Sequence, residues 1–115
     1  MNSINLSGTI HSEEIVLRQT PQKLMVTSFV LCVPREDKKN HDLKENNDYF
    51  TIVCWSNMAL YVVENFKSGM KVIVKGSLHT GRRKLKDYVV YKDGELIPEF
   101  WIPNDEVYAQ RVELA

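Results

Sequence analysis

Hydrophobic and polar residues alternate along much of the chain with the period of two that is typical of β-strands. The first such segment spans residues 4–10, and the pattern resumes over 15–18 after a break at 11–13. Turn-forming residues at 20–23 then precede a long apolar segment, 24–33. Two long strands that meet at this turn predict a β-hairpin.

The segment 49–55 is the one around which we expect the fold to be organised. It is β-branched and aromatic and too short for a helix, so it predicts a strand. Apolar residues then follow at the spacing of one helical face, with Ser56 or Asn57 as the N-cap and Gly69 as the C-cap. These apolar residues are Met58, Ala59, Val62, Val63 and Phe66.

A further strand is predicted over 72–78, with Gly76 as a bulge or bend. The chain then makes an excursion over about 80–103, in which an Asp-Gly pair between β-prone segments predicts a second hairpin. After a turn at 102–105 we expect a closing strand over 107–114. The strand, helix and strand arrangement favours a small barrel whose open end the helix plugs.

The predicted fold is all-β: a five-stranded Greek-key OB-fold barrel with one α-helix between strands 3 and 4. Residues of about 34–48 are polar and mixed in charge, and we expect them to form a mobile surface loop. No repeat, low-complexity tract or linker divides the 115 residues, so we expect a single domain, 1–115.

The composition, 43% hydrophobic and 26% charged, is that of an ordinary globular domain. No apolar segment approaches the ~20 residues of a membrane helix, and the N-terminus lacks a secretory pattern. We expect Cys32 and Cys54, both in apolar strands, to be reduced core thiols rather than a disulfide. The expected location is the cytoplasm or nucleoid, or the mitochondrion if an upstream transit peptide has been removed.

The formal net charge is zero, yet the basic residues are concentrated between residues 67 and 92, where Asp87 is the single acid. This excess favours contact with phosphates over a merely solvated hairpin. The predicted phosphate-binding residues are Lys71, Lys75, Arg82, Arg83, Lys84 and Lys86.

Catalytic and metal-binding patterns are missing from the sequence. His11, His41 and His79 are far apart and make no metal-ligand spacing with the two cysteines. The chain has no glycine-rich phosphate loop, nucleophile elbow or His-Glu-x-x-His segment. We therefore expect a protein that is not an enzyme and needs no cofactor or metal.

Four segments in this order resemble the single-stranded DNA-binding proteins of bacteria and mitochondria. They are residues 2–10, 18–21, 49–55 and 59–78. The resemblance implies non-catalytic binding of single-stranded DNA in replication, repair or recombination, with bases stacked on aromatic side chains and phosphates held by lysine and arginine. The same fold also binds single-stranded RNA, so both nucleic acids remain candidates.

By position, Tyr49 and Trp55 match the two stacking aromatic residues of this family's third strand. The period of two places both on one face, with Phe50, Ile52 and Cys54 directed to the core. For Trp55 a surface role is favoured over a core role. For Tyr49, stacking and packing against the neighbouring loop are equally weighted.

The chain departs from the family where Arg82 and Arg83 replace an aromatic residue after the fourth strand, and where residues 34–36 replace another. Tyr88 and Trp101 are the expected substitute stacking residues, although Trp101 is as well suited to anchor its own hairpin. The family's acidic tail, which recruits partners, is absent from this sequence, either because it has been removed or because the chain is a specialised member. These departures suit an alternative function: an OB subunit that acts mainly in protein interaction or RNA binding, as in primosomal or mitochondrial RNA-editing complexes. By the same resemblance we expect a homodimer or homotetramer, with other replication or ribonucleoprotein subunits as possible partners.

Overall fold

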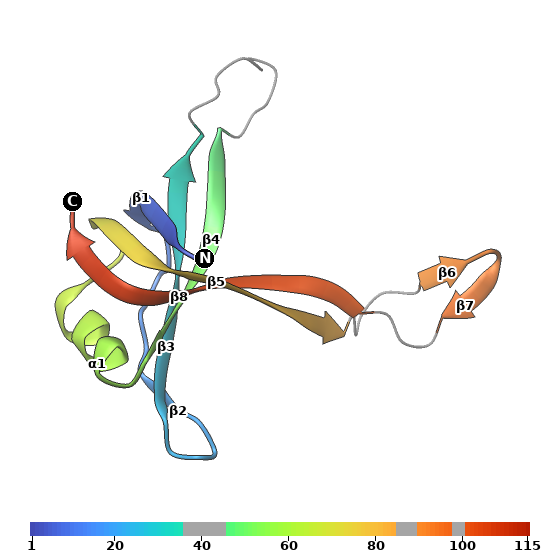
Figure 1. The fold of residues 1–115 in the computed structure, drawn as a ribbon, viewed down its shortest axis with the longest axis horizontal. Helices are drawn as coiled ribbons and strands as arrows, with labels where there is room; N and C mark the ends of the chain where they lie inside the picture. The colour runs from blue at the N-terminus through green and yellow to red at the C-terminus, as the bar shows by residue number, and fades with distance from the viewer. Residues whose placement is uncertain (36–45, 85–89, 98–100) are drawn as a thin grey trace.

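The computed structural model describes residues 1–35, 46–84, 90–97 and 101–115. One helix and eight strands lie in these ranges (Figure 1). In chain order they are β1 (Ile4–Ile10), β2 (Arg18–Gln19), β3 (Met25–Pro34), β4 (Asn47–Trp55), α1 (Ser56–Asn65), β5 (Lys71–Lys84), β6 (Val90–Lys92), β7 (Glu95–Ile97) and β8 (Trp101–Leu114).

The five long strands β1, β3, β4, β5 and β8 form a closed barrel. Their order is β1-β5-β8-β4-β3, and a further pairing of β1 with β3 closes the ring. All pairings are antiparallel except β4 with β8, which is parallel. This confirms the predicted all-β OB-fold barrel. The helix lies between β4 and β5 rather than between strands 3 and 4, because the two-residue β2 is a separate strand that the prediction did not count.

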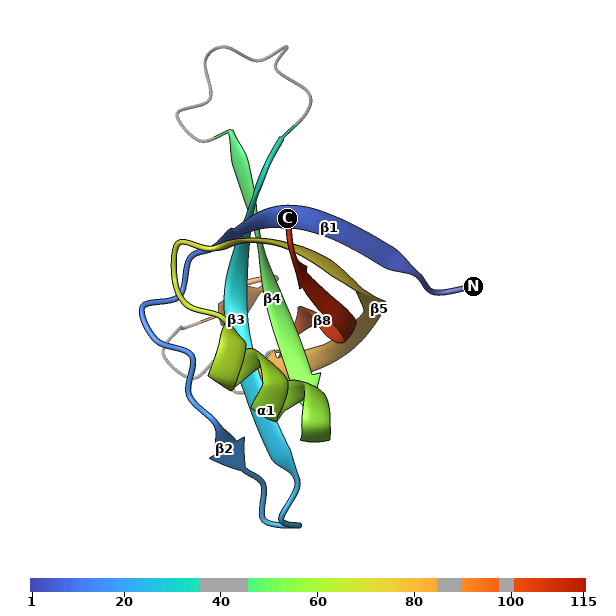
Figure 2. The ribbon, with the colours of Figure 1, turned by 90° about the vertical axis from the view of Figure 1, so that its left-hand side faces the viewer.

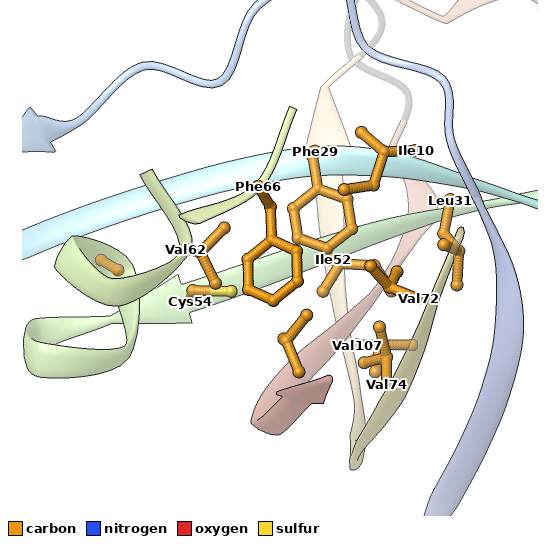
Figure 3. Packing of buried hydrophobic residues seen from close by; sticks show 12 residues of the cluster. Ile10, Phe29, Leu31, Ile52, Cys54, Val62, Phe66, Val72, Val74 and Val107 are labelled. Atoms are coloured by element: carbon orange, nitrogen blue, oxygen red, sulfur yellow. The ribbon is translucent and has the colours of Figure 1, made fainter. Parts of the chain in front are cut away.

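The core fills the inside of the barrel, and α1 packs across one end of it (Figures 2 and 3). Ala59, Val62 and Phe66 are buried on the predicted helical face. Ile52 and Cys54 of β4 are also fully buried, as the alternation predicted, while Phe50 is half-buried against the cluster. The remaining buried apolar residues of the cluster are Ile10, Phe29, Leu31, Val72, Val74, Val107 and Val112.

Both predicted helix caps are wrong. The helix begins at Ser56 itself, after Trp55, and no side chain caps its N-terminus. At the other end Phe66 has an extended backbone, and its amide donates to the Val62 carbonyl oxygen over 3.0 Å. The helix stops there because Phe66 turns into the core. Gly69 lies three residues further on, in a turn with φ of 88°.

The predicted long strand over 15–18 is also wrong, since only Arg18 and Gln19 pair with β3. Side-chain hydrogen bonds replace the backbone ladder before that point. The Val30 amide donates to Ser12 Oγ over 2.7 Å, and Thr27 Oγ1 donates to the Val16 carbonyl oxygen over 2.7 Å. These side chains hold the segment beside β3 without a regular strand.

Strands β5 and β8 are much longer than predicted and extend from the barrel as a two-stranded arm (Figure 1). The turn predicted at 102–105 is instead part of β8, with Pro103 opposite Arg82. Proline is tolerated there because this part of β8 pairs with β5 alone, so the missing N–H breaks no second ladder. Residues 80–84, which were expected to belong to the excursion, are likewise part of β5 and pair with β8.

Two predictions of local backbone geometry, a bulge and a turn, are confirmed. The register between β5 and β8 shifts between Lys75 and Gly76, which is the expected bulge. Asp93 and Gly94 both have positive φ, 53° and 80°, in the turn that joins β6 to β7. Most of the expected loop at 34–48 lies outside the described residues.

Candidate nucleic-acid interface

The outer face of β2, β3, β4 and β8 carries two adjacent rows of side chains. Strand register places Tyr108 beside Val53, and Val53 beside Ser28. In the next row Trp55 lies beside Val26, and Val26 beside Arg18. Since inward residues alternate with these along each strand, both rows face away from the core.

Three rings form an aromatic cluster on this face, which consists of Trp55, His79 and Tyr108. The centroids of the Trp55 and Tyr108 rings are 6.0 Å apart, and the two planes are tilted by 60°. His79 stacks on Tyr108 with a centroid distance of 3.9 Å and an interplanar angle of 11°. Ser77 Oγ lies 3.0 Å from His79 Nε2, within hydrogen-bonding distance of the imidazole. The cluster joins β4, β5 and β8.

A groove of about 330 Å³ opens beside this cluster. Arg18 lies on its wall, and its guanidinium donates to Ser28 Oγ over 3.1 Å. The floor contains Val53, which is 5% exposed. Half of the lining residues are apolar or aromatic and half are polar or charged, so the groove offers both a stacking surface and hydrogen-bonding groups. The residues lining the groove are Arg18, Gln19, Val26, Ser28, Val53, Trp55, Glu106 and Tyr108.

Tyr49 lies on the same outer face of β4 as Trp55 but at the other end of the strand. Their positions differ by six residues, which corresponds to ~20 Å along the strand. Tyr49 is 47% exposed, and its ring centroid is 5.3 Å from that of His11. It lines a second groove, of about 340 Å³, together with Leu78 and Asp105. The two predicted stacking residues therefore share a face without touching the same groove.

Arg82 and Trp101 meet on the β5–β8 arm. The Arg82 guanidinium carbon lies 5.7 Å from the centroid of the Trp101 ring, within cation–π range. Trp101 is 48% exposed. This pair leaves the arm with an exposed aromatic surface next to a fixed positive charge.

The other predicted basic residues are placed less favourably or are not described. Lys71 and Lys75 are exposed on β5, with Lys75 opposite Arg111 on β8, but neither lines the groove beside Trp55. The backbone of Arg83 and Lys84 belongs to β5, and their side chains are not described. Lys86 and Tyr88 lie outside the described residues.

Sequence reasoning missed Tyr108, His79, Arg18 and Glu106 as members of this face. A local signal existed for two of them, because Glu106 and Tyr108 alternate with the inward residue Val107 in the closing strand. Nothing local indicated that Tyr108 would lie beside Trp55. That contact depends on the parallel pairing of β4 with β8.

In the part of the chain that the structure describes, no group of three or more histidine, cysteine, aspartate or glutamate residues is placed to hold a metal ion. The described helix is too short to cross a membrane. The chemical groups that the outer face offers are aromatic rings, guanidinium groups and hydrogen-bonding side chains.

The family model for the single-strand binding protein family matches residues 1–94 of the chain. No curated protein matches the chain. The matched range covers the barrel through β5 and includes Tyr49, Trp55 and His79. Trp101, Glu106 and Tyr108 lie beyond it.

Proposed function

Because the chain belongs to the single-strand binding protein family, whose members bind single-stranded nucleic acid without catalysis, we propose that its ligand is single-stranded DNA. The proposed setting is DNA replication, repair or recombination, where exposed strands must be held. Binding would combine base stacking with phosphate contacts and would depend little on sequence, because every base has a face that can stack.

The observation that supports this proposal most is the aromatic cluster Trp55, His79 and Tyr108 on the outer face of the barrel. Trp55 is only partly buried, and it lines the groove and does not belong to the core cluster. Tyr49, further along β4, would take a second base, since about 20 Å of strand accommodates several nucleotides. Arg82 on the arm would contact phosphates and, with Trp101, provide a further stacking surface.

Tryptophan fluorescence titrated with oligo-dT and oligo-U tests this function directly. The variant Trp101→Phe leaves Trp55 as the one reporter in the chain, and we expect its emission to be quenched on binding. Trp55→Ala, followed by fluorescence anisotropy of a labelled strand, should lose ~1–3 kcal/mol of binding free energy. Leu60→Ala is the matched control, because Leu60 is an exposed apolar residue of α1 away from the groove.

The titration also separates the alternatives. Tighter binding of oligo-U than of oligo-dT would favour RNA over DNA as the ligand. Binding of neither strand would favour the protein-interaction function, for which the zero net charge and the carboxylate of Glu106 on the interface are the supporting observations. Equal binding by Trp55→Ala and the parent at matched salt would refute stacking on Trp55.

We also propose that the protein is a homodimer or homotetramer. Family members typically oligomerise, and β1 offers a suitable edge: it pairs with β5 along its length but with β3 only at Thr9 and Ile10. Asn5 and Ser7 are exposed on this strand. A free edge with polar side chains can add a strand from a second copy. Light scattering during size exclusion measures the mass, and a monomer at micromolar concentration would refute this proposal.

A further inference from the structure

We propose that the groove beside Trp55 and Tyr108 binds a single nucleobase and prefers one that carries an exocyclic amino group. Tyr108 would be the stacking platform, and Glu106 would accept a hydrogen bond from the amino group. The inference rests on the proposed binding of single strands and adds a base preference to it. It concerns residues of β8 beyond the range that the family model matches.

Tyr108 is built as a rigid platform. One side of its ring is covered by the stacked imidazole of His79, at 3.9 Å, and Trp55 stands 6.0 Å away at a tilt. A phenol ring held in this way loses little side-chain freedom when a base stacks on it, which favours affinity. The groove of about 330 Å³ lies at the lower end of the ~300–1,000 Å³ range of ligand sites, which suits a single base.

Glu106 is the one carboxylate among the residues lining this groove. It precedes Tyr108 by two residues on the same side of β8 and is half-buried. A negative charge at this position opposes phosphate, so electrostatic attraction to the strand does not explain it. An ionised carboxylate only accepts hydrogen bonds. It can therefore pair with the amino groups of bases, or with the ring N–H groups of guanine, uracil and thymine.

The oxygens of Glu106 have acceptor capacity to spare. Within the described residues, the hydrogen bond recorded for it comes from Asn104 Nδ2 at 3.5 Å, which is longer than a good N–H···O bond. The neighbouring cation, Arg18, donates to Ser28 Oγ instead. A base stacked on Tyr108 would therefore meet an acceptor that its amino group can satisfy.

This chemistry discriminates between pyrimidines. Where the carboxylate faces position 4 of the ring, cytosine presents a 4-amino donor that pairs with it, whereas uracil and thymine present a 4-oxo acceptor that it repels. The N3–H of uracil and thymine is the competing donor, and it lies one ring atom away. Deoxycytidine and deoxyuridine differ at this edge and share the same ring size and the same lack of a 5-methyl group. Comparing them isolates the edge contact from stacking strength and from the methyl group.

The test measures affinity for short oligo-dC and oligo-dU strands by fluorescence anisotropy at matched salt, for the full chain and its variants. We expect the ratio of affinities, dC over dU, to fall about fivefold in Glu106→Gln relative to the parent, because one hydrogen bond and one repulsion are exchanged for an amide that can pair with either base. Glu113→Gln is the matched control. It removes the same charge from the same strand, from a residue paired with Arg111 rather than in the groove.

A second variant tests the platform. Tyr108→Leu should weaken binding of both strands and bring the dC over dU ratio toward that of Glu106→Gln, since a base that does not stack cannot present its edge. If Glu106→Gln and Glu113→Gln tighten binding equally and leave the ratio at the parent's value, Glu106 acts only through its charge and the inference is overturned while strand binding stands. If the parent binds neither strand, both the inference and the proposed function fail.

Discussion

Replacing Gly76 by alanine should destabilise the barrel, because at the bulge of β5 there is no room for a side chain. A Cβ atom built on Gly76 would lie 2.2 Å from the Tyr108 carbonyl oxygen and 2.9 Å from its carbonyl carbon. Ordinary van der Waals contacts of this kind are 3.4–4 Å, so β8 would have to move by about 1 Å. The obstacle is backbone held in a sheet, and rotation of a side chain cannot relieve it.

The expected cost is ~2 kcal/mol in the free energy of unfolding. Overpacking of a filled site costs ~1–3 kcal/mol, and the alanine recovers only ~0.4–1 kcal/mol by restricting the unfolded chain. For a domain of this size the melting temperature should fall by roughly 8 °C. Urea denaturation followed by circular dichroism gives the free energy, and the slope with denaturant should be unchanged.

Gly81→Ala is the matched control, on the same strand. The nearest atom to its Cβ would be the Asn104 carbonyl oxygen, at 4.0 Å, so the methyl group fits. We expect this variant to be equally stable or to gain ~0.5 kcal/mol. A Gly76→Ala protein as stable as Gly81→Ala would refute the close approach of β5 and β8 at the bulge. Because the clash falls on the backbone of Tyr108, Gly76→Ala should also weaken the binding of single-stranded DNA, and Gly81→Ala should not.

Three further predictions concern single side chains. Thr27→Val should cost ~1–3 kcal/mol in urea denaturation, since it leaves the Val16 carbonyl oxygen unpaired, whereas Thr27→Ser keeps the bond. Burial raises the pKa of the Cys54 thiol from 9.0 to about 12 in the folded protein. As the pH rises, the thiol of the unfolded chain therefore loses its proton before that of the folded protein. The free energy of unfolding should fall by ~1.4 kcal/mol per pH unit between pH 9.0 and about 12. Cys54→Ala should flatten that part of the pH profile, and an unchanged profile would contradict the assignment. Arg82→Ala should reduce the log–log salt slope of strand binding by ~0.7 if Arg82 contacts a phosphate, and an unchanged slope would exclude that contact.

The existence of the long strands and the helix could be predicted from the sequence, because each depends on a local pattern. The period of two in residues 49–55 and the helical spacing after them reflect which side chains reach the core. Boundaries were harder to predict. Pro103 is accommodated in β8 because this part of the strand pairs with β5 alone. Residues 12–17 are held beside β3 by hydrogen bonds of the Ser12 and Thr27 side chains rather than by a backbone ladder.

The candidate site could be predicted only in part, for a related reason. Alternation along one strand placed Tyr49 and Trp55 on the outer face, and the structure agrees with that placement. The partner of Trp55 is Tyr108, 53 residues later in the chain, and it is brought there by strand pairing. A local pattern contains no information about which strand will become a neighbour, so the groove itself and Glu106 were beyond reach.

The parallel pairing of β4 with β8 consists of two residue pairs, Ile52 with Val107 and Val53 with Tyr108. The ladder between β1 and β3 is equally short. At both places the barrel should open more readily than along the longer β5–β8 ladder, and the amides there should exchange with solvent sooner. Trp55 and Tyr108 stand on opposite sides of the seam between β4 and β8. A base held in the groove would contact both β4 and β8, because both strands line it. Binding of single-stranded DNA should therefore slow hydrogen exchange at this seam, and ligand occupancy and barrel closure should be thermodynamically coupled.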